Sequence, residues 1–108
     1  MTNINNRNLN KLVEQVEQWS IDKGLDKSDS SKQALKFYEE AGEVAAALVR
    51  KDMDALKDGI GDTIVTLIIL AQQEGTDIAE CLEVAYNEIK GRTGKMVAGV
   101  FVKEEDLK

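Results

Sequence analysis

The spacing of apolar residues along the first half of the chain predicts two helices. Between residues 7 and 22, apolar side chains recur every three or four positions and share one helical face, formed by Leu9, Leu12, Val13, Val16 and Trp19. A second helix is expected from about Ser30 to about Lys51, because Ser30 and Gln33 have the spacing of a capping box. Gly24 and a short polar segment separate the two.

A third predicted helix is apolar on nearly every face. We expect it to begin at Ala55, after a cap at Asp52 or Asp54, and to end before Gly75. Residues 64–71 are aliphatic except for one threonine, so neighbouring helices should enclose them in a bundle or at an oligomer interface. The β-branched content also permits a strand here, but the length and the glycine stop favour a helix.

The C-terminal third of the chain predicts one more helix and then less regular structure. Asp77 and Glu80 again have capping-box spacing, and the helix they open should reach about Lys90. A glycine-flanked basic turn, a short extended piece and a polar tail are expected to follow, at residues 91–95, 98–102 and 103–108.

Composition supports a mainly helical chain. The 108 residues contain no proline and are rich in Glu, Lys, Ala and Leu, which are good helix formers. We therefore predict an all-α protein, a single domain over residues 1–108 built as a four-helix bundle with a short extended C-terminal tail. A core of this size is modest, and short chains often complete their burial by oligomerising, so a homo-oligomer is expected.

Charge and cysteine content limit the possible binding partners and the compartment of the protein. The net charge of −6 argues against nucleic-acid binding, which relies on many basic residues. The single cysteine, Cys81, cannot form an internal disulfide and fits a reducing compartment. The first 12 residues lack the apolar core of a signal peptide, and the apolar run at residues 64–71 is too short to span a bilayer. We therefore expect a cytoplasmic protein with neither nucleic acid nor membrane as a partner.

Acidic residues on the second predicted helix are the first candidates for chemistry. Glu40 and Glu43 are three positions apart and Glu39 and Glu43 four apart, so their carboxylates project towards one side of a helix. Lys36 lies one turn before Glu40 and adds an ammonium group there. Taken alone, such a pattern is more often a solvated face with ion pairs.

A second acidic motif makes a metal site a real alternative. Asp58 and Asp62 are four positions apart at the start of the apolar third helix, where an unpaired carboxylate is costly and a partner is expected. Gly59 and Gly61 lower helix propensity, which is reasonable where another backbone or a ligand approaches closely. Asp58 could instead simply complement the helix dipole.

The two motifs together suggest a hard cation and a phosphate ligand. If the second and third helices pack antiparallel, Glu40, Glu43 and Asp62 could face each other and offer only oxygen ligands, which suits Mg²⁺ or Mn²⁺. With no histidine in the chain, His-ligated zinc and a Ser-His triad are excluded. The basic side chains that could meet phosphate oxygens, or else form a helix cap and a solvated tail, are Lys90, Arg92 and Lys95. Trp19 is expected in the core, with an edge that could stack on a base.

The order and spacing of these motifs resemble those of the MazG-like nucleoside triphosphate pyrophosphohydrolases, and more closely the short MazG-like proteins of phages and Gram-positive bacteria. The resemblance is carried by residues 36–44 and 59–62, by the aliphatic helix that follows, and by residues 87–96; it extends over about residues 30 to 103. It implies an all-α oligomer and Mg²⁺-dependent cleavage of a nucleoside triphosphate, between the α and β phosphates, to a monophosphate and pyrophosphate.

Carried over by position, the resemblance assigns metal-binding carboxylates to Glu40, Glu43 and Asp62 and an adjacent acid to Glu39. The fourth family carboxylate falls at position 59, which is glycine here, and Asp58 is the neighbouring candidate to replace it. We expect Glu39 or Glu40 to activate water, and Lys36 with the C-terminal cations to stabilise the leaving pyrophosphate. The alternative function is a non-catalytic protein of this fold that binds a nucleotide or a partner after losing one ligand.

Overall fold

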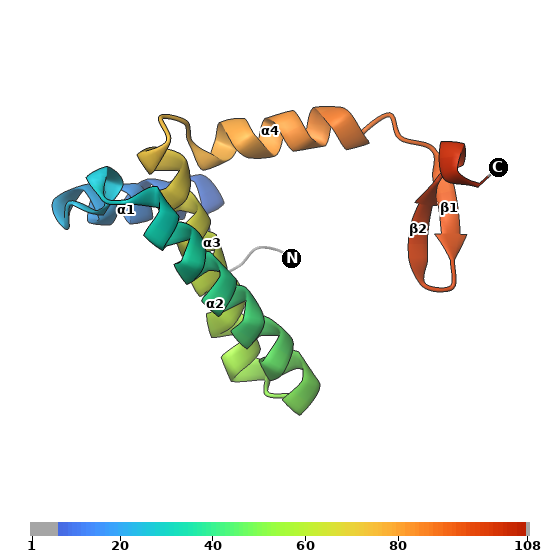
Figure 1. Cartoon of the computed structure of the whole chain (residues 1–108), viewed down its shortest axis with the longest axis horizontal. Helices are drawn as coiled ribbons and strands as arrows, with labels where there is room; N and C mark the ends of the chain where they lie inside the picture. The colour runs from blue at the N-terminus through green and yellow to red at the C-terminus, as the bar shows by residue number, and fades with distance from the viewer. Residues whose placement is uncertain (1–6, 108) are drawn as a thin grey trace. The chain divides into compact units, whose positions relative to one another are not determined.

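The computed structural model describes residues 7–107 and contains the four predicted helices followed by a short β-hairpin (Figure 1). In chain order the elements are α1 (Leu9–Asp22), the 3₁₀ helix η1 (Leu25–Lys27), α2 (Ser30–Arg50), α3 (Met53–Gln73), α4 (Ile78–Ile89), β1 (Gly94–Val97), β2 (Val100–Lys103) and η2 (Glu104–Asp106). The mainly helical prediction is confirmed. The chain divides into two compact units, Met1–Ile78 and Ala79–Lys108. The ends of the predicted single domain, residues 1–6 and 108, lie outside the described residues.

The starts of α2 and α3 are set by aspartate caps. The Asp29 side chain accepts hydrogen bonds from the backbone N–H of Ser31 at 2.9 Å and from its hydroxyl at 2.7 Å, so the predicted Ser30–Gln33 capping box is wrong. Gln33 instead donates its amide to the carbonyl oxygen of Thr66 on α3 at 3.1 Å. At the start of α3, the predicted cap at Asp52 is confirmed by a 3.1 Å hydrogen bond from the backbone N–H of Ala55.

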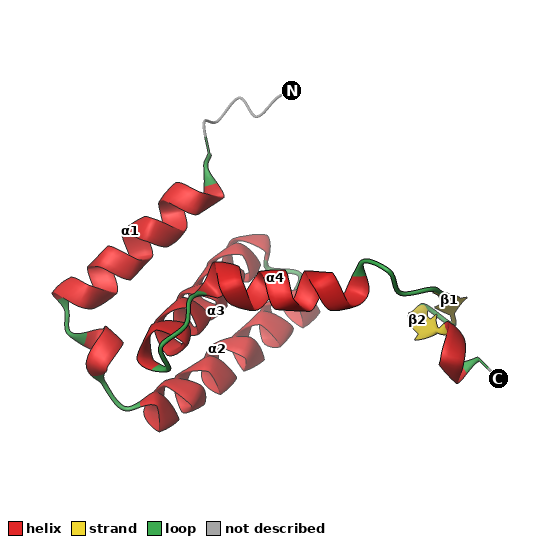
Figure 2. Ribbon diagram, turned by 90° about the horizontal axis from the view of Figure 1, so that it is seen from above, coloured by secondary structure: helices red, strands yellow, loops and turns green. Residues whose placement is uncertain are grey.

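Helices α2 and α3 form an antiparallel hairpin, and they lie side by side in both views (Figures 1 and 2). The reversal needs only two residues, because Lys51 adopts a left-handed conformation with φ of 58° and Asp52 already caps α3. Gly59 is buried at a close contact between the helices: a Cβ added there would lie 3.2 Å from Cγ2 of Val44. The expected close approach is confirmed at Gly59, whereas a Cβ on Gly61 would meet nothing within 4 Å.

The core of the first unit is small and is supplied mainly by α3. The buried side chains are Ile68, Ile69, Ala71 and Thr66 of α3, Ala47 and Glu40 of α2, and Ser20 of α1. Amide side chains hold the N-terminal elements to α3, since Gln72 donates to the carbonyl of Glu17 at 3.2 Å and Gln73 to that of Leu25 at 2.9 Å. The expected enclosure of α3 is partial, because Ile60 and Ile64 on its other faces remain 47% and 41% exposed.

The second unit consists of most of α4, the hairpin and η2. Strands β1 and β2 pair antiparallel, with Met96 opposite Phe101, and the turn uses left-handed conformations at Ala98 (φ 50°) and Gly99 (φ 81°). The predicted extended piece is therefore the second half of a hairpin. Lys95, expected in a turn, lies in β1. Over residues 7–107, no helix is both long enough and apolar enough to cross a membrane.

Candidate functional site

The acidic motif of α2 is organised around a single ammonium group. Lys36 Nζ lies 3.0 Å from Oε1 of Glu39 and 3.1 Å from Oε2 of Glu40. Hydrogen bonds to Glu39 and then to Glu40 raise the pKa of Lys36 to about 12. Glu39 is exposed, but Glu40 is buried against its neighbours, with only 8% of its surface accessible. A buried carboxylate requires a compensating charge, and here Lys36 provides it.

Glu43, one turn further along α2, adds a second carboxyl group beside Glu40. Interaction with the Glu40 side chain, first by hydrogen bonding and then by charge repulsion, raises the pKa of Glu43. Two carboxyl groups close enough to share a hydrogen bond favour either retention of a proton or binding of a cation between them. The side chain of Glu43 is itself exposed, so a ligand from solvent can reach the pair.

The acidic motif of α3 interacts with that of α2. Burial, followed by the negative charges of Asp58 and Glu40, raises the pKa of Asp62, while the positive charge of Lys36 opposes this effect. Because Asp62 responds to Glu40 and Lys36 across the helix hairpin, the two acidic motifs lie in one region of the first unit. Antiparallel packing of α2 on α3 is the cause, as the short link between them predicts.

The donor set of this region fits a hard divalent cation in its chemistry. All candidate ligands are carboxylate oxygens, which Mg²⁺ and Mn²⁺ prefer. Neighbouring carboxylates contribute to the raised pKa of Glu43 and, after burial, to that of Asp62, and a cation would neutralise this charge. As the side chains are placed, no three or more acidic or cysteine residues in the described part of the chain converge closely enough to hold a metal ion. The carboxylates form one pair on each helix, Glu40 with Glu43 and Asp58 with Asp62.

Trp19 is not a core residue, contrary to the expectation for its ring. It is 48% exposed and lines an open apolar hollow of about 360 Å³ with Leu12, Gln15, Val16 and Val65. Val65 is one turn along α3 from Asp62, so the hollow and the acidic region share that helix. A half-exposed indole face beside an apolar hollow is compatible with stacking on a planar ring.

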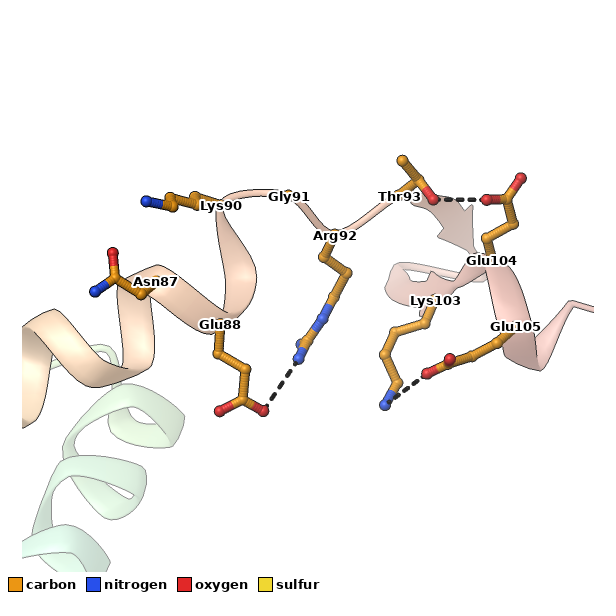
Figure 3. Close-up of a pocket in the computed structure, with 9 residues that line it drawn as sticks. All are labelled: Asn87, Glu88, Lys90, Gly91, Arg92, Thr93, Lys103, Glu104 and Glu105. Atoms are coloured by element: carbon orange, nitrogen blue, oxygen red, sulfur yellow. Dashed lines mark hydrogen bonds and ion pairs between the residues drawn. The ribbon is translucent and has the colours of Figure 1, made fainter.

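The basic candidates Lys90, Arg92 and Lys95 belong to the second unit, and only two of them line the same hollow. Lys90 and Arg92 border an open hollow of about 930 Å³ between the end of α4 and the base of the hairpin, whereas Lys95 does not (Figure 3). Arg92 points to Glu88, with 3.7 Å between Nη2 of Arg92 and Oε1 of Glu88. The side chain of Lys90 points away from Arg92 (Figure 3). These three cations are therefore not gathered into one phosphate cradle.

Lys103 is a residue of this hollow that the sequence reasoning missed. It lies 3.4 Å from Glu105, and close by the Thr93 hydroxyl donates to Glu104 at 2.7 Å (Figure 3). The strand register brings it there, since Lys103 pairs with Gly94 just after the basic turn. A hairpin predicted from a possible turn at residues 98–99 would have indicated this position of Lys103.

Comparison with known proteins defines the class of this chain. Residues 29–97 match the model of the MazG nucleotide pyrophosphohydrolase domain, and the chain belongs to that family. The matched region includes both acidic motifs and extends into the second unit as far as the end of β1. The resemblance inferred from the motifs is thus confirmed at the level of the family.

One relative comes from a bacteriophage. The chain is 39% identical over 70 residues to an uncharacterized 18.2 kDa protein in the rep-hol intergenic region of Haemophilus phage HP1 (strain HP1c1). The alignment covers 64% of this chain but 43% of the phage protein, so the chain spans less than half the length of this relative. No solved structure matches the chain.

Proposed function

We propose that this protein is a Mg²⁺-dependent nucleoside triphosphate pyrophosphohydrolase, which cleaves a ribo- or deoxyribonucleoside triphosphate to the monophosphate and pyrophosphate. The observation that carries the proposal is the antiparallel packing of α2 on α3, which brings Asp62 within range of the charges of Glu40 and Lys36, in a member of a family of nucleotide pyrophosphohydrolases. Lys36 compensates the charge of the buried Glu40, but Glu43 and Asp62 add further carboxyl groups of raised pKa, and a cation would relieve the repulsion among them.

The metal would be held by Glu40, Glu43 and Asp62, with Asp58 as a fourth ligand. Bound there, Mg²⁺ or Mn²⁺ would neutralise phosphate charge and favour ionisation of a water molecule. The acidic protein needs such a cation, because bare carboxylates repel the polyphosphate that they are proposed to bind.

The remaining chemistry falls to side chains of α2. The oxygen of a water molecule attacks the α-phosphorus, the bond from that phosphorus to the bridging oxygen breaks, and pyrophosphate leaves with the bonding electrons. The proton of the water passes to a carboxylate, which we assign to Glu39 or Glu40. Lys36, which lies within 3.1 Å of both, orients these carboxylates and balances charge as the leaving group departs.

Two further contacts with the substrate belong to this proposal. Lys90, Arg92 and Lys95 would meet phosphate oxygens, and Trp19 would stack on the base beside its apolar hollow. The half-exposed apolar side chains found on every helix support self-association.

A non-catalytic binding protein is the second candidate, and Gly59 favours it. The family places a carboxylate at this position, but here the Cα faces Val44 so closely that a Cβ would lie 3.2 Å from its Cγ2. A protein that retained the fold with three ligands could bind nucleotide without turning it over.

The test is release of pyrophosphate from a panel of ribo- and deoxyribonucleoside triphosphates, with Mg²⁺, with Mn²⁺ and with EDTA. Metal-dependent release that falls by about a hundredfold or more in Glu40→Gln, Glu43→Gln and Asp62→Asn, but not in the exposed α1 control Glu14→Gln, would support the enzyme. Folded wild-type protein that releases none, yet is stabilised by Mg²⁺ with a nucleotide, would establish the binding protein instead.

A further inference from the structure

The acidic region of the first unit already contains a cation, the ammonium group of Lys36. Its Nζ lies 3.0 Å from Oε1 of Glu39 and 3.1 Å from Oε2 of Glu40, and Glu40 is one of the carboxylates proposed to hold the metal. Within residues 7–107, no three acidic residues converge closely enough to bind a metal ion. Lys36 therefore engages an oxygen that a metal ion would need.

The contact with Lys36 is local to α2. Lys36 precedes Glu39 by three positions and Glu40 by four, which are the spacings at which side chains on one helix face meet. Glu40 is only 8% exposed, and a buried carboxylate needs a compensating positive charge. By contrast, no ion pair within residues 7–107 involves Glu43 or Asp62. Lys36 thus compensates Glu40 and leaves these two carboxyl groups to another cation.

An ammonium group and a divalent cation make incompatible demands on Glu40. An ammonium group donates three hydrogen bonds, whereas Mg²⁺ gathers about six oxygens at about 2.1 Å and carries twice the charge. Two cations on one buried carboxylate would repel each other strongly, because little water lies between them to screen their charges. The ammonium group is the one that can withdraw, since it is carried on a flexible stem of four carbons.

We propose that Lys36 stands in for the metal ion in the free protein and leaves Glu39 and Glu40 when Mg²⁺ or Mn²⁺ binds. This inference rests on the proposed function and deepens it, because it names the residue that holds the ligands before the metal is present. After its release, Lys36 remains tethered one turn from Glu40. From there it can supply the positive charge that the proposed reaction requires as pyrophosphate departs.

The first experiment measures Mn²⁺ binding by electron paramagnetic resonance, without nucleotide, in Lys36→Met and Lys32→Met. Lys32 is an exposed lysine one turn earlier on α2 and forms no ion pair within the described residues, so its variant loses the same charge but no such contact. We expect Lys36→Met to bind Mn²⁺ at least about fivefold more tightly than the wild-type protein. We expect Lys32→Met to stay within about twofold, because its charge is more distant and better screened.

The direction of the change separates this role from a merely structural one. If Lys36 only kept the carboxylates in place, its removal would weaken Mn²⁺ binding. Lys36→Arg, which retains a cation beside Glu39 and Glu40, should bind Mn²⁺ no more tightly than the wild-type protein. Equal or weaker binding in Lys36→Met, or an equal gain in Lys32→Met, would overturn the inference.

A second experiment uses the wild-type protein and keeps the inference testable if Lys36→Met does not fold. In ¹⁵N-labelled protein, the two hydrogen bonds of the Lys36 ammonium group should slow the exchange of its protons with water. We expect saturating Mg²⁺ to remove this protection and to leave the ammonium signal of Lys32 unchanged. Protection that persists after Mg²⁺ has shifted the backbone amides of Glu43 and Asp62, or amides that never shift, would contradict the stand-in role.

Metal binding and catalysis are measured separately, so the two proposals can fail independently. A protein that releases Lys36 on binding Mg²⁺ but produces no pyrophosphate would support the stand-in role and refute the enzyme. Metal-dependent pyrophosphate release by a protein in which Lys36 keeps both contacts would refute the stand-in role alone.

Discussion

Replacing Gly59 by alanine, with Gly61→Ala as a matched control, tests whether the α2–α3 hairpin depends on a close contact at the acidic region. Both glycines lie in α3, two positions apart, and both substitutions add one methyl group. They differ in their surroundings: the new Cβ at position 59 lies 3.2 Å from Cγ2 and 3.6 Å from Cα of Val44, and at position 61 it meets nothing within 4 Å.

The expected magnitudes follow from two opposing effects. Alanine is favoured over glycine in a helix interior by about 1 kcal/mol, so Gly61→Ala should raise the free energy of unfolding by about that amount. At position 59 the same gain is opposed by overpacking against the stiff, β-branched Val44, which costs about 1–3 kcal/mol. Gly59→Ala should therefore be less stable than Gly61→Ala by about 1–3 kcal/mol, a difference of several degrees in Tm for a chain of this size.

The assay is urea unfolding followed by far-UV circular dichroism, at a fixed protein concentration because the proposed self-association would add to stability. Val44→Ala removes the contacted Cγ2, so in that background the two glycine substitutions should differ by less than about 0.5 kcal/mol. The reasoning would be refuted by a Gly59→Ala variant that gains as much stability as Gly61→Ala. It would also be refuted by a difference that persists without the Val44 methyl groups.

The other predictions concern charge and capping. Because the folded state raises the pKa of Glu43 and Asp62 above 4.5 and 3.8, their stabilising effect is complete below those values. It is lost as the pH rises through the raised pKa, and Mg²⁺ should increase Tm only above that range, which thermal melts against pH would check. Lys36→Met should lower the stability of the metal-free protein, since the buried Glu40 loses its partner, and added Mg²⁺ should reduce the difference. Asp52→Ala should cost about 1 kcal/mol in urea unfolding, and a similar loss in Asp52→Asn, which retains the cap, would contradict the capping role.

Apolar periodicity was sufficient to predict the helical class and four helices whose ends lie within two residues of the observed ones. Helix periodicity is a property of one chain segment, so it can be recognised without knowing which other segments pack against it. The close approach at Gly59 could also be predicted, because glycine in a helix interior is unfavourable unless a neighbouring group leaves no room for a side chain. The order of acidic motifs was enough to indicate the family.

Other features depended on residues far apart in sequence. The cap of α2 is Asp29 and not the predicted pair, because the amide of Gln33 reaches Thr66 on another helix. Trp19 remains half-exposed although its spacing marks a core face, since a periodic pattern identifies which face is apolar but not how much of it a neighbour covers. Lys103 reaches the basic hollow only through the pairing of β1 with β2.

By itself, then, the sequence determined where helices form and which side chains share a face, because these follow from the repeat of a single chain segment. The tertiary structure decided which faces meet: it set Glu40 beside Lys36 in a buried position and Asp62 within reach of their charges.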